Sequence, residues 1–86
     1  MSIRKLNDGF NVISDNLIKL RKAKHLSQAD VANDLNLLGI NIHKNDISKI
    51  EANVRVVKDY ELYGFAKVLV VSILDLLDGI EGKLEK

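Results

Sequence analysis

The sequence lacks cysteine, proline and tryptophan throughout its 86 residues. The absence of cysteine excludes disulfides and thiolate metal sites, and it makes the reducing cytoplasm the expected location. The absence of proline removes the strongest helix breaker, which suits an all-helical chain joined by short turns. No apolar run reaches the ~18–20 residues of a membrane span, and no signal-peptide pattern is present, so we expect no membrane association.

Patterns for catalysis and metal binding are also missing. The two histidines, His25 and His43, lie in separate segments with no carboxylate at ligand spacing, which is typical of surface or capping histidines. The five glycines are scattered and form no phosphate-binding loop. The serines have no nucleophile-elbow setting and no evident base. We therefore expect no enzyme, no metal site and no cofactor.

The charge of the chain is unevenly distributed. Its formal net charge is only +1, which by itself argues weakly against nucleic-acid binding. Between Lys19 and Lys58, however, eight basic residues face four acidic ones, a balance of +4, and the remainder carries −3. Such an excess is either a solvated face or the electrostatic footprint of a DNA-binding unit.

The residues from Ser27 to Asn53 read as two short helices with a connection between them. Ser27 is a good N-cap, and Asp30 lies three residues later, where an acid completes a capping box. In the second helix Ile47 and Ile50 face one way, and polar residues cover the rest. Such a helix is either a solvated surface helix or one that enters a DNA groove.

The order of short motifs in this region favours a helix that enters a DNA groove over a solvated surface helix. Leu26-Ser27-Gln28, Val31-Ala32 and Ile47-Ser48-Lys49-Ile50-Glu51 follow one another at near-family spacing. This order resembles the Xre-type helix-turn-helix family, the phage-repressor-like or Cro/C1-type DNA-binding domains. Further matches lie on both sides of the two helices, at Leu17, Leu20-Arg21, Leu62, Phe65-Ala66, Leu69, Ile73 and Leu76-Leu77.

The resemblance covers most of the chain and implies a fold. It implies an all-α, compact five-helix bundle of the lambda repressor-like type over residues 12–78, with the helix-turn-helix at helices 2 and 3. Residues 1–11 are then a flexible N-terminal arm, and residues 79–86 are a charged C-terminal tail. The resemblance also implies a structural ion pair between Arg21 and Glu51.

The connection between the two helices is a few residues longer than the tight turn usual in the family. We expect helix 2 to continue through Leu38, with Gly39 as its left-handed cap. Ile40 and Ile42 would then insert into the core. The longer connection leaves open the angle at which the second helix meets DNA.

The other helices have their own boundary signals. We expect helix 1 to span Val12 to Lys24 with Asn11 as its N-cap, and helix 4 to follow Asp59 as its N-cap. Ser72 is the expected cap of a last short helix ending at Leu77. Gly64, within helix 4, indicates close packing against a neighbour.

The expected DNA contacts come from both helices and the loop after them. Asn45 can pair with adenine and Lys44 can reach guanine, while Lys49 suits phosphate and Ser48 suits either. Asp46 can accept from a cytosine amine, form a local cap or discourage wrong sequences. The nine DNA-binding candidates are Ser27, Gln28, Lys44, Asn45, Asp46, Ser48, Lys49, Asn53 and Arg55.

The C-terminal region holds more apolar residues than one end of a small bundle buries, and exposed apolar patches often mark interfaces. The expected homodimer interface consists of Val68, Val70, Val71, Leu74 and Ile80. By resemblance, the expected function is a sequence-specific transcriptional regulator, a prokaryotic, phage or mobile-element repressor that binds inverted half-sites. Two alternatives remain, an antitoxin with a toxin protein as its partner and a helical interaction module without DNA binding.

Overall fold

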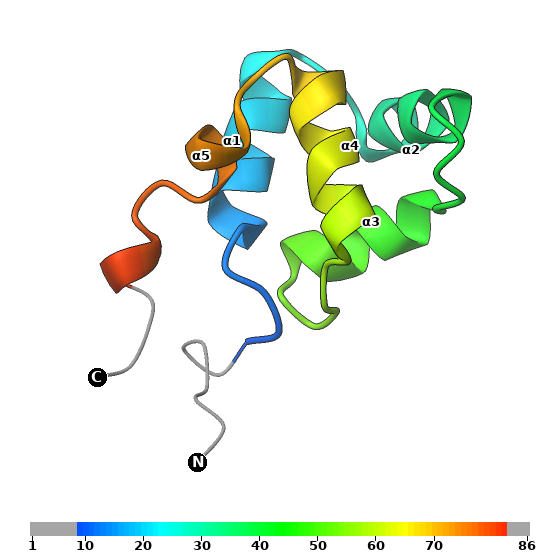
Figure 1. Cartoon of the computed structure of the whole chain (residues 1–86). Helices are drawn as coiled ribbons and strands as arrows, with labels where there is room; N and C mark the ends of the chain where they lie inside the picture. Colours follow the sequence, from blue (N-terminus) through cyan, green and yellow to red (C-terminus); the bar gives the residue numbers. More distant parts are fainter. Residues whose placement is uncertain (1–8, 83–86) are drawn as a thin grey trace.

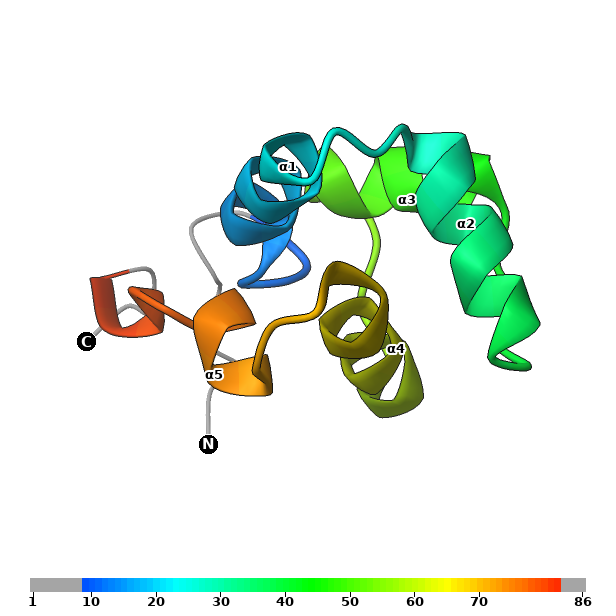
Figure 2. The same ribbon diagram turned by 90° about the horizontal axis from the view of Figure 1, so that it is seen from above.

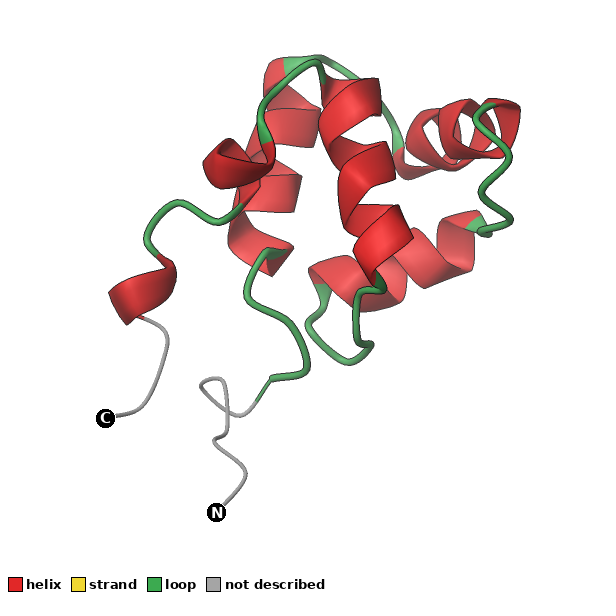
Figure 3. Cartoon of the chain, in the orientation of Figure 1, coloured by secondary structure: helices red, strands yellow, loops and turns green. Residues whose placement is uncertain are grey.

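A computed structural model of the protein describes residues 9–82, which form five α-helices and one final 3₁₀ turn (Figures 1 and 3). None of these residues forms a β-strand, so the expected compact, all-α five-helix fold is confirmed. Within the same range, no helix has the length and apolarity needed to cross a membrane. The elements are α1 (Ser14–Ala23), α2 (Gln28–Leu37), α3 (Lys44–Glu51), α4 (Asp59–Leu69), α5 (Ile73–Leu76) and η1 (Ile80–Gly82).

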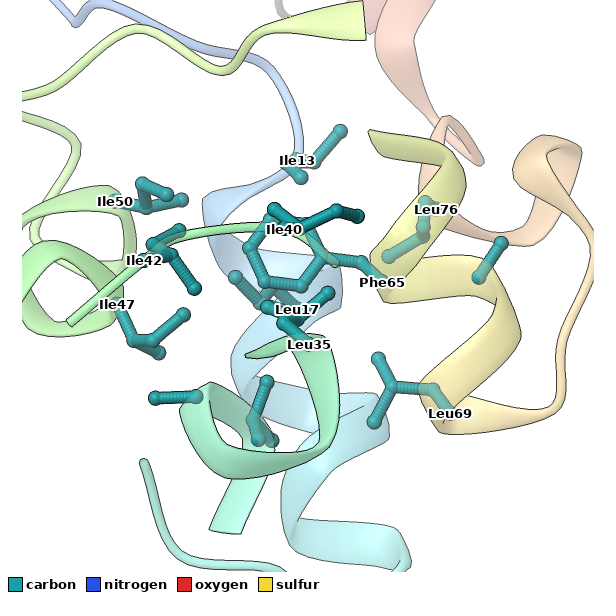
Figure 4. Packing of buried hydrophobic residues seen from close by; sticks show 13 residues of the cluster. Ile13, Leu17, Leu35, Ile40, Ile42, Ile47, Ile50, Phe65, Leu69 and Leu76 are labelled. Carbon is teal, nitrogen blue, oxygen red and sulfur yellow. The ribbon is translucent and has the colours of Figure 1, made fainter. Parts of the chain in front are cut away.

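Each of the five helices contributes at least one fully buried side chain to a single core (Figure 4). Viewed from above, α2 lies on one side of the bundle and α1 with α5 on the other, with α3 and α4 between them (Figure 2). Burying an aliphatic or aromatic side chain of this size contributes ~1.5–3 kcal/mol. The largest apolar members are Leu17, Leu35, Ile47, Ile50, Phe65, Leu69 and Leu76.

Capping boxes start α2 and α5, where the sequence predicts a capping box at Ser27 and an N-cap at Ser72. The hydroxyl of Ser27 accepts from the backbone N–H of Asp30 at 3.0 Å, and Asp30 accepts from the N–H of Ser27 at 2.8 Å. Ser72 and Asp75 repeat the arrangement at 3.1 and 2.9 Å. The hydrogen bonds from Ser27, first from its backbone N–H and then from its hydroxyl, lower the pKa of Asp30.

The connection between α2 and α3 is part of the core. Leu38 caps α2, and Gly39 follows with a φ of +88°, the left-handed conformation that favours glycine. Ile40 and Ile42 then insert into the core, as expected. At Gly64 of α4, an added Cβ would come within 2.5 Å of the Ile40 and Leu35 side chains, so α4 approaches α2 and the connection closely.

The predicted starts of α1 and α4 are wrong by one or two residues. α1 begins at Ser14, and its N-cap is Ile13. Asn11 is buried, and its Oδ1 atom accepts from the backbone N–H of Ile13 at 3.0 Å, before the first residue of the helix. Its Nδ2 atom donates to the carbonyls of Ile50 at 3.1 Å and Arg55 at 3.0 Å, so Asn11 joins the segment before α1 to the end of α3 and the loop after it. Asp59 is the first residue of α4, whose cap is Lys58.

The N-terminal segment is anchored earlier than residue 11. The backbone N–H groups of Phe10 and Asn11 both donate to Asn53 Oδ1, at 3.0 and 2.8 Å. The last residues of the predicted arm therefore contact the end of α3 in this structure. The rest of that arm, residues 1–8, and the end of the predicted tail, residues 83–86, lie outside the described residues.

Candidate nucleic-acid interface

α3 has an anchored face and a free face. Ile47 and Ile50 are fully buried in the core (Figure 4). The remaining outward residues are exposed, and their side chains form no hydrogen bond or ion pair with another described residue. These four free side chains are Lys44, Asn45, Ser48 and Lys49. All four are among the expected DNA-binding residues, and they leave two ammonium groups, an amide and a hydroxyl available for a ligand.

An ion pair holds the C-terminal end of α3 to α1. Arg21 Nε and Nη2 donate to the two oxygens of Glu51 at 2.6 and 3.0 Å, and only 12% and 7% of the two side chains are exposed. Arg21 Nη1 also donates to the carbonyl of Leu26 at 2.8 Å. The hydrogen bond to Glu51 raises the pKa of Arg21. The pair that the resemblance implied is therefore present, and it also ties down the loop before α2.

Gln28 joins this ion pair from the start of α2. Its Nε2 atom donates to Glu51 Oε1 at 2.9 Å. This bond uses one of the two N–H donors of the amide, and the second remains available to a phosphate oxygen. Gln28 therefore links the start of α2 to the end of α3 in this conformation. Ser27 is occupied by its capping box.

Asn53, an expected DNA contact, holds the segment before α1 against the end of α3 in this structure. It ends α3 with a φ of +61°, as its helix-ending role requires. Its Oδ1 atom accepts the two N–H groups of Phe10 and Asn11. Gly9 packs directly on its amide, because an added Cβ there would fall 1.8 Å from Asn53 Nδ2.

Arg55, expected to bind phosphate, is instead bound to Glu61. Its Nη1 and Nη2 atoms donate to the two Glu61 oxygens at 2.8 and 2.9 Å, and Nη1 also donates to the carbonyl of Val56 at 3.1 Å. The Glu61 side chain is only 2% exposed, so it needs a cation beside it. Arg55 is therefore engaged chiefly by groups of its own chain in this conformation.

Glu61 was missed in the sequence because it reads as an ordinary acid in the first turn of a helix. Burial by itself would raise the pKa of Glu61, but the hydrogen bonds from Arg55 and from the Lys58 backbone N–H outweigh it and lower the pKa. The same pair raises the pKa of Arg55, chiefly through the hydrogen bond to Glu61. The sequence signal that could have indicated this ion pair is an arginine and a glutamate six residues apart, on either side of the start of a helix.

Asp46 has local partners rather than a free carboxylate. Its Oδ2 atom accepts from the backbone N–H of His43 at 2.9 Å, and its Oδ1 atom lies 3.7 Å from Arg55 Nε. Of the three roles considered for this acid, local capping matches these contacts. The Arg55 guanidinium also offsets its negative charge on the polar helix α3.

The basic residues between Lys19 and Lys58 therefore divide into two groups. The two arginines, Arg21 and Arg55, are bound to glutamates, and the six lysines are all exposed. Lys58 lies over the Tyr60 ring, 5.8 Å from its centroid. The cations available to a polyanion in this stretch are thus lysines, which contact phosphate as point charges rather than as two-pronged forks.

An open groove of about 410 Å³, with both polar and apolar lining residues, lies beside the start of α3. Asn33 and Asn36 of α2 line it, together with Asn41 and His43 of the long connection. Lys44 lies at its edge, so the groove adjoins the free face of α3. The longer connection therefore adds one amide side chain, that of Asn41, next to the residues expected to read DNA.

Only part of the expected dimer interface is exposed. Val68 and Val71 pack against the core of their own chain, and Ile80 is half-buried. Val70 and Leu74 are 77% and 76% exposed. Val70 also has a φ of +55°, which is strained for a β-branched residue.

The chain matches no protein-family model, and it matches no curated protein. The functional argument therefore rests on the residues and the geometry of this chain.

Proposed function

We propose that the protein is a sequence-specific, double-stranded DNA-binding regulator of the Xre type that reads the major groove with α3. The observation that carries the proposal is the free face of α3, with four exposed polar side chains that no described residue engages. A helix whose opposite face is locked into a core can present such side chains rigidly to base edges.

The chemistry of the free face assigns a role to each side chain. Asn45 can donate to N7 and accept from the N6 amine of adenine, and Lys44 can donate to guanine O6 or N7. Ser48, one turn further, can contact a base or a phosphate. Lys49 contributes a phosphate contact, since ammonium groups bind phosphate without base specificity.

The exposed basic side chains between Lys19 and Lys58 are all lysines, and their small number determines the expected affinity for DNA. Each phosphate contact lowers the logarithm of the binding constant by about 0.9 per tenfold increase in salt concentration. With both arginines bound to glutamates and a net charge of +1, few such contacts are available. Binding is therefore modest in affinity and sensitive to salt.

The proposed regulator acts as a homodimer through Val70 and Leu74. Both of these large apolar side chains are about three-quarters exposed, and exposed apolar surface favours a protein contact. A symmetric dimer binds two inverted half-sites about one helical turn, ~34 Å, apart. The proposed biological role is repression of transcription in the cytoplasm of a prokaryote, or in a phage or mobile element.

Selection from random duplexes tests the DNA-binding part of the proposal. The duplexes are about 30 base pairs long, enough for two half-sites one helical turn apart. Enrichment of an inverted repeat is the expected result. Asn45→Ala and Lys44→Ala should then weaken binding to the enriched duplex, while Lys67→Ala, an exposed lysine on α4, serves as the matched control. No enrichment at low salt would contradict the proposal.

Sedimentation of Leu74→Asp tests the dimer separately. The variant should be monomeric at concentrations where the wild-type protein is dimeric, because a charge at an apolar interface is costly to bury. Leu37→Asp is the control, since Leu37 is also highly exposed but lies on α2. A monomeric wild-type protein would contradict the homodimer.

The same exposed pair supports a second candidate function. If the chain is an antitoxin or a helical interaction module, Val70 and Leu74 contact a different protein. Co-purification with a second protein would favour the antitoxin, which would also bind DNA through α3. Absence of duplex binding, together with a monomeric wild-type protein, would favour the interaction module over the regulator.

A further inference from the structure

Arg55 lies between two carboxylates that belong to different helices. Its Nη1 and Nη2 atoms bind Glu61 at 2.8 and 2.9 Å, and its Nε atom lies 3.7 Å from Oδ1 of Asp46. Glu61 is in the first turn of α4, and Asp46 is in the first turn of α3. One guanidinium therefore connects the starts of the two helices.

Asp46 carries this connection to the residues that face DNA. Its other oxygen, Oδ2, accepts from the backbone N–H of His43, the residue at the N-cap of α3. Asp46 directly follows Lys44 and Asn45 in the same helical turn. Because residues of one turn move together, a displacement of Asp46 displaces both of these side chains.

We propose that Arg55 is a positioning residue for DNA recognition, which holds the start of α3 in register through Asp46 without itself touching DNA. The inference rests on the proposed function. It adds that the choice of DNA sequence depends on a residue that does not itself contact the DNA. Glu61 supplies the fixed point, since its nearly fully buried carboxylate holds the guanidinium by two hydrogen bonds.

Two other roles for these residues make different predictions. If Arg55 contacts phosphate directly, lysine replaces it well, because both cations bind phosphate. If Asp46 only repels phosphates, its neutralisation strengthens binding to every duplex. A positioning role differs from both, because it predicts a loss of discrimination between sequences.

The test measures binding of Arg55→Lys, Asp46→Asn and the double variant to the selected duplex and to a scrambled duplex, over a range of salt concentrations. Asp46→Asn retains an acceptor for His43 but loses the charge that faces Arg55. Arg55→Lys retains the positive charge but cannot reach both carboxylates in fork geometry. Asp75→Asn is the matched control, because Asp75 has the same capping position in α5.

The expected result is a loss of specificity. In each single variant the ratio of affinities for the two duplexes falls about twofold to thirtyfold, the range for coupling through residues that do not touch the ligand. The double variant falls no further than the single variants, and the salt dependence stays unchanged. Asp75→Asn retains the wild-type ratio.

Several results would overturn the inference. They are an unchanged ratio in Asp46→Asn, tighter binding of both duplexes by that variant, and an unchanged ratio in a folded Arg55→Lys variant. Thermal unfolding establishes that each variant is folded, and Asp46→Asn with its control decides alone if Arg55→Lys does not fold. A wild-type protein that binds no duplex would overturn the proposed function and this inference together, whereas wild-type specificity retained in both variants would overturn this inference alone.

Discussion

Both ends of α3 are held by an arginine and a glutamate, but the two pairs act over different lengths of chain. Arg21 and Glu51 are 30 residues apart and join α1 directly to the end of α3. Arg55 and Glu61 are six residues apart and fasten the α3–α4 loop to α4, reaching α3 only through Asp46 at 3.7 Å. The C-terminal end of α3 is therefore fixed by a direct tertiary bond, and the N-terminal end by an indirect one.

The two pairs are therefore expected to act differently: the Arg21–Glu51 pair stabilises the fold, and the Arg55–Glu61 pair positions the start of α3. A direct pair between helices distant in sequence stabilises the whole bundle, because it is lost only when the bundle opens. A local pair with a longer reach to a second helix chiefly sets where that helix starts. Substitutions at the two pairs therefore affect different measurable properties.

The largest effect is expected for Arg21→Ala. It leaves Glu51 without its cation in a nearly buried site, which costs about 3–5 kcal/mol of the free energy of unfolding. Urea denaturation followed by circular dichroism measures the loss. The double variant Arg21→Met/Glu51→Leu should be more stable than Arg21→Ala, because it leaves no unpaired charge. A loss below about 1 kcal/mol would place this pair among ordinary surface ion pairs.

A smaller effect with a distinct pH dependence is expected for Glu61→Gln. Its amide loses charge-assisted hydrogen bonds to Arg55, which costs about 1.5–3 kcal/mol at neutral pH. The lowered pKa of Glu61 stabilises the folded state fully above its ordinary value of 4.5. As pH falls below that value toward the lowered pKa, protonation removes this contribution.

Denaturation curves across this acidic range check the sign. The difference in stability between wild type and Glu61→Gln should shrink as pH falls from 4.5, since protonated glutamate resembles the amide. Asp59→Asn is the control, because it removes a neighbouring acid that has no ion pair among the described residues. A difference that stays constant down the acidic range would contradict the charge-assisted role of Glu61.

The smallest effect is expected for Gln28→Ala. It removes one hydrogen bond to Glu51 and leaves the ion pair with Arg21 in place, for a loss of about 0.5–1.5 kcal/mol. Thermal unfolding measures it. If the loss in Gln28→Ala equals that in Arg21→Ala, the ion pair is not the main tie at this end of α3, and the comparison between the two ends fails.

The sequence predicted those features that depend on neighbours along the chain. The capping boxes of Ser27 and Ser72 need only a residue three positions away, and Gly39 marks the end of α2 by its own backbone freedom. The buried residues of each helix followed from helical spacing. The Arg21–Glu51 pair followed from the resemblance, since nothing local joins residues 30 positions apart.

Four polar side chains could not be assigned from the sequence in this way. Asn11 was expected to cap α1, and Gln28, Asn53 and Arg55 were expected to contact DNA, but each is bound to a group inside the chain. Polar side chains bind whichever group lies within reach, and the folded backbone decides what is within reach. Glu61 was overlooked for the same reason, because its burial depends on how α4 meets the loop before it.

The sequence by itself determined the helices, the core positions, the left-handed turn at Gly39 and the four side chains of α3 that face away from the core. These follow from backbone preferences and from apolar periodicity, which act over a few residues. Only the tertiary structure decided which basic side chains have no acidic partner and which amide side chains bond to distant backbone groups. It also decided that Arg55 links the start of α3 to α4. These features depend on groups distant along the chain meeting within hydrogen-bond or ion-pair range, a condition that local sequence pattern does not encode.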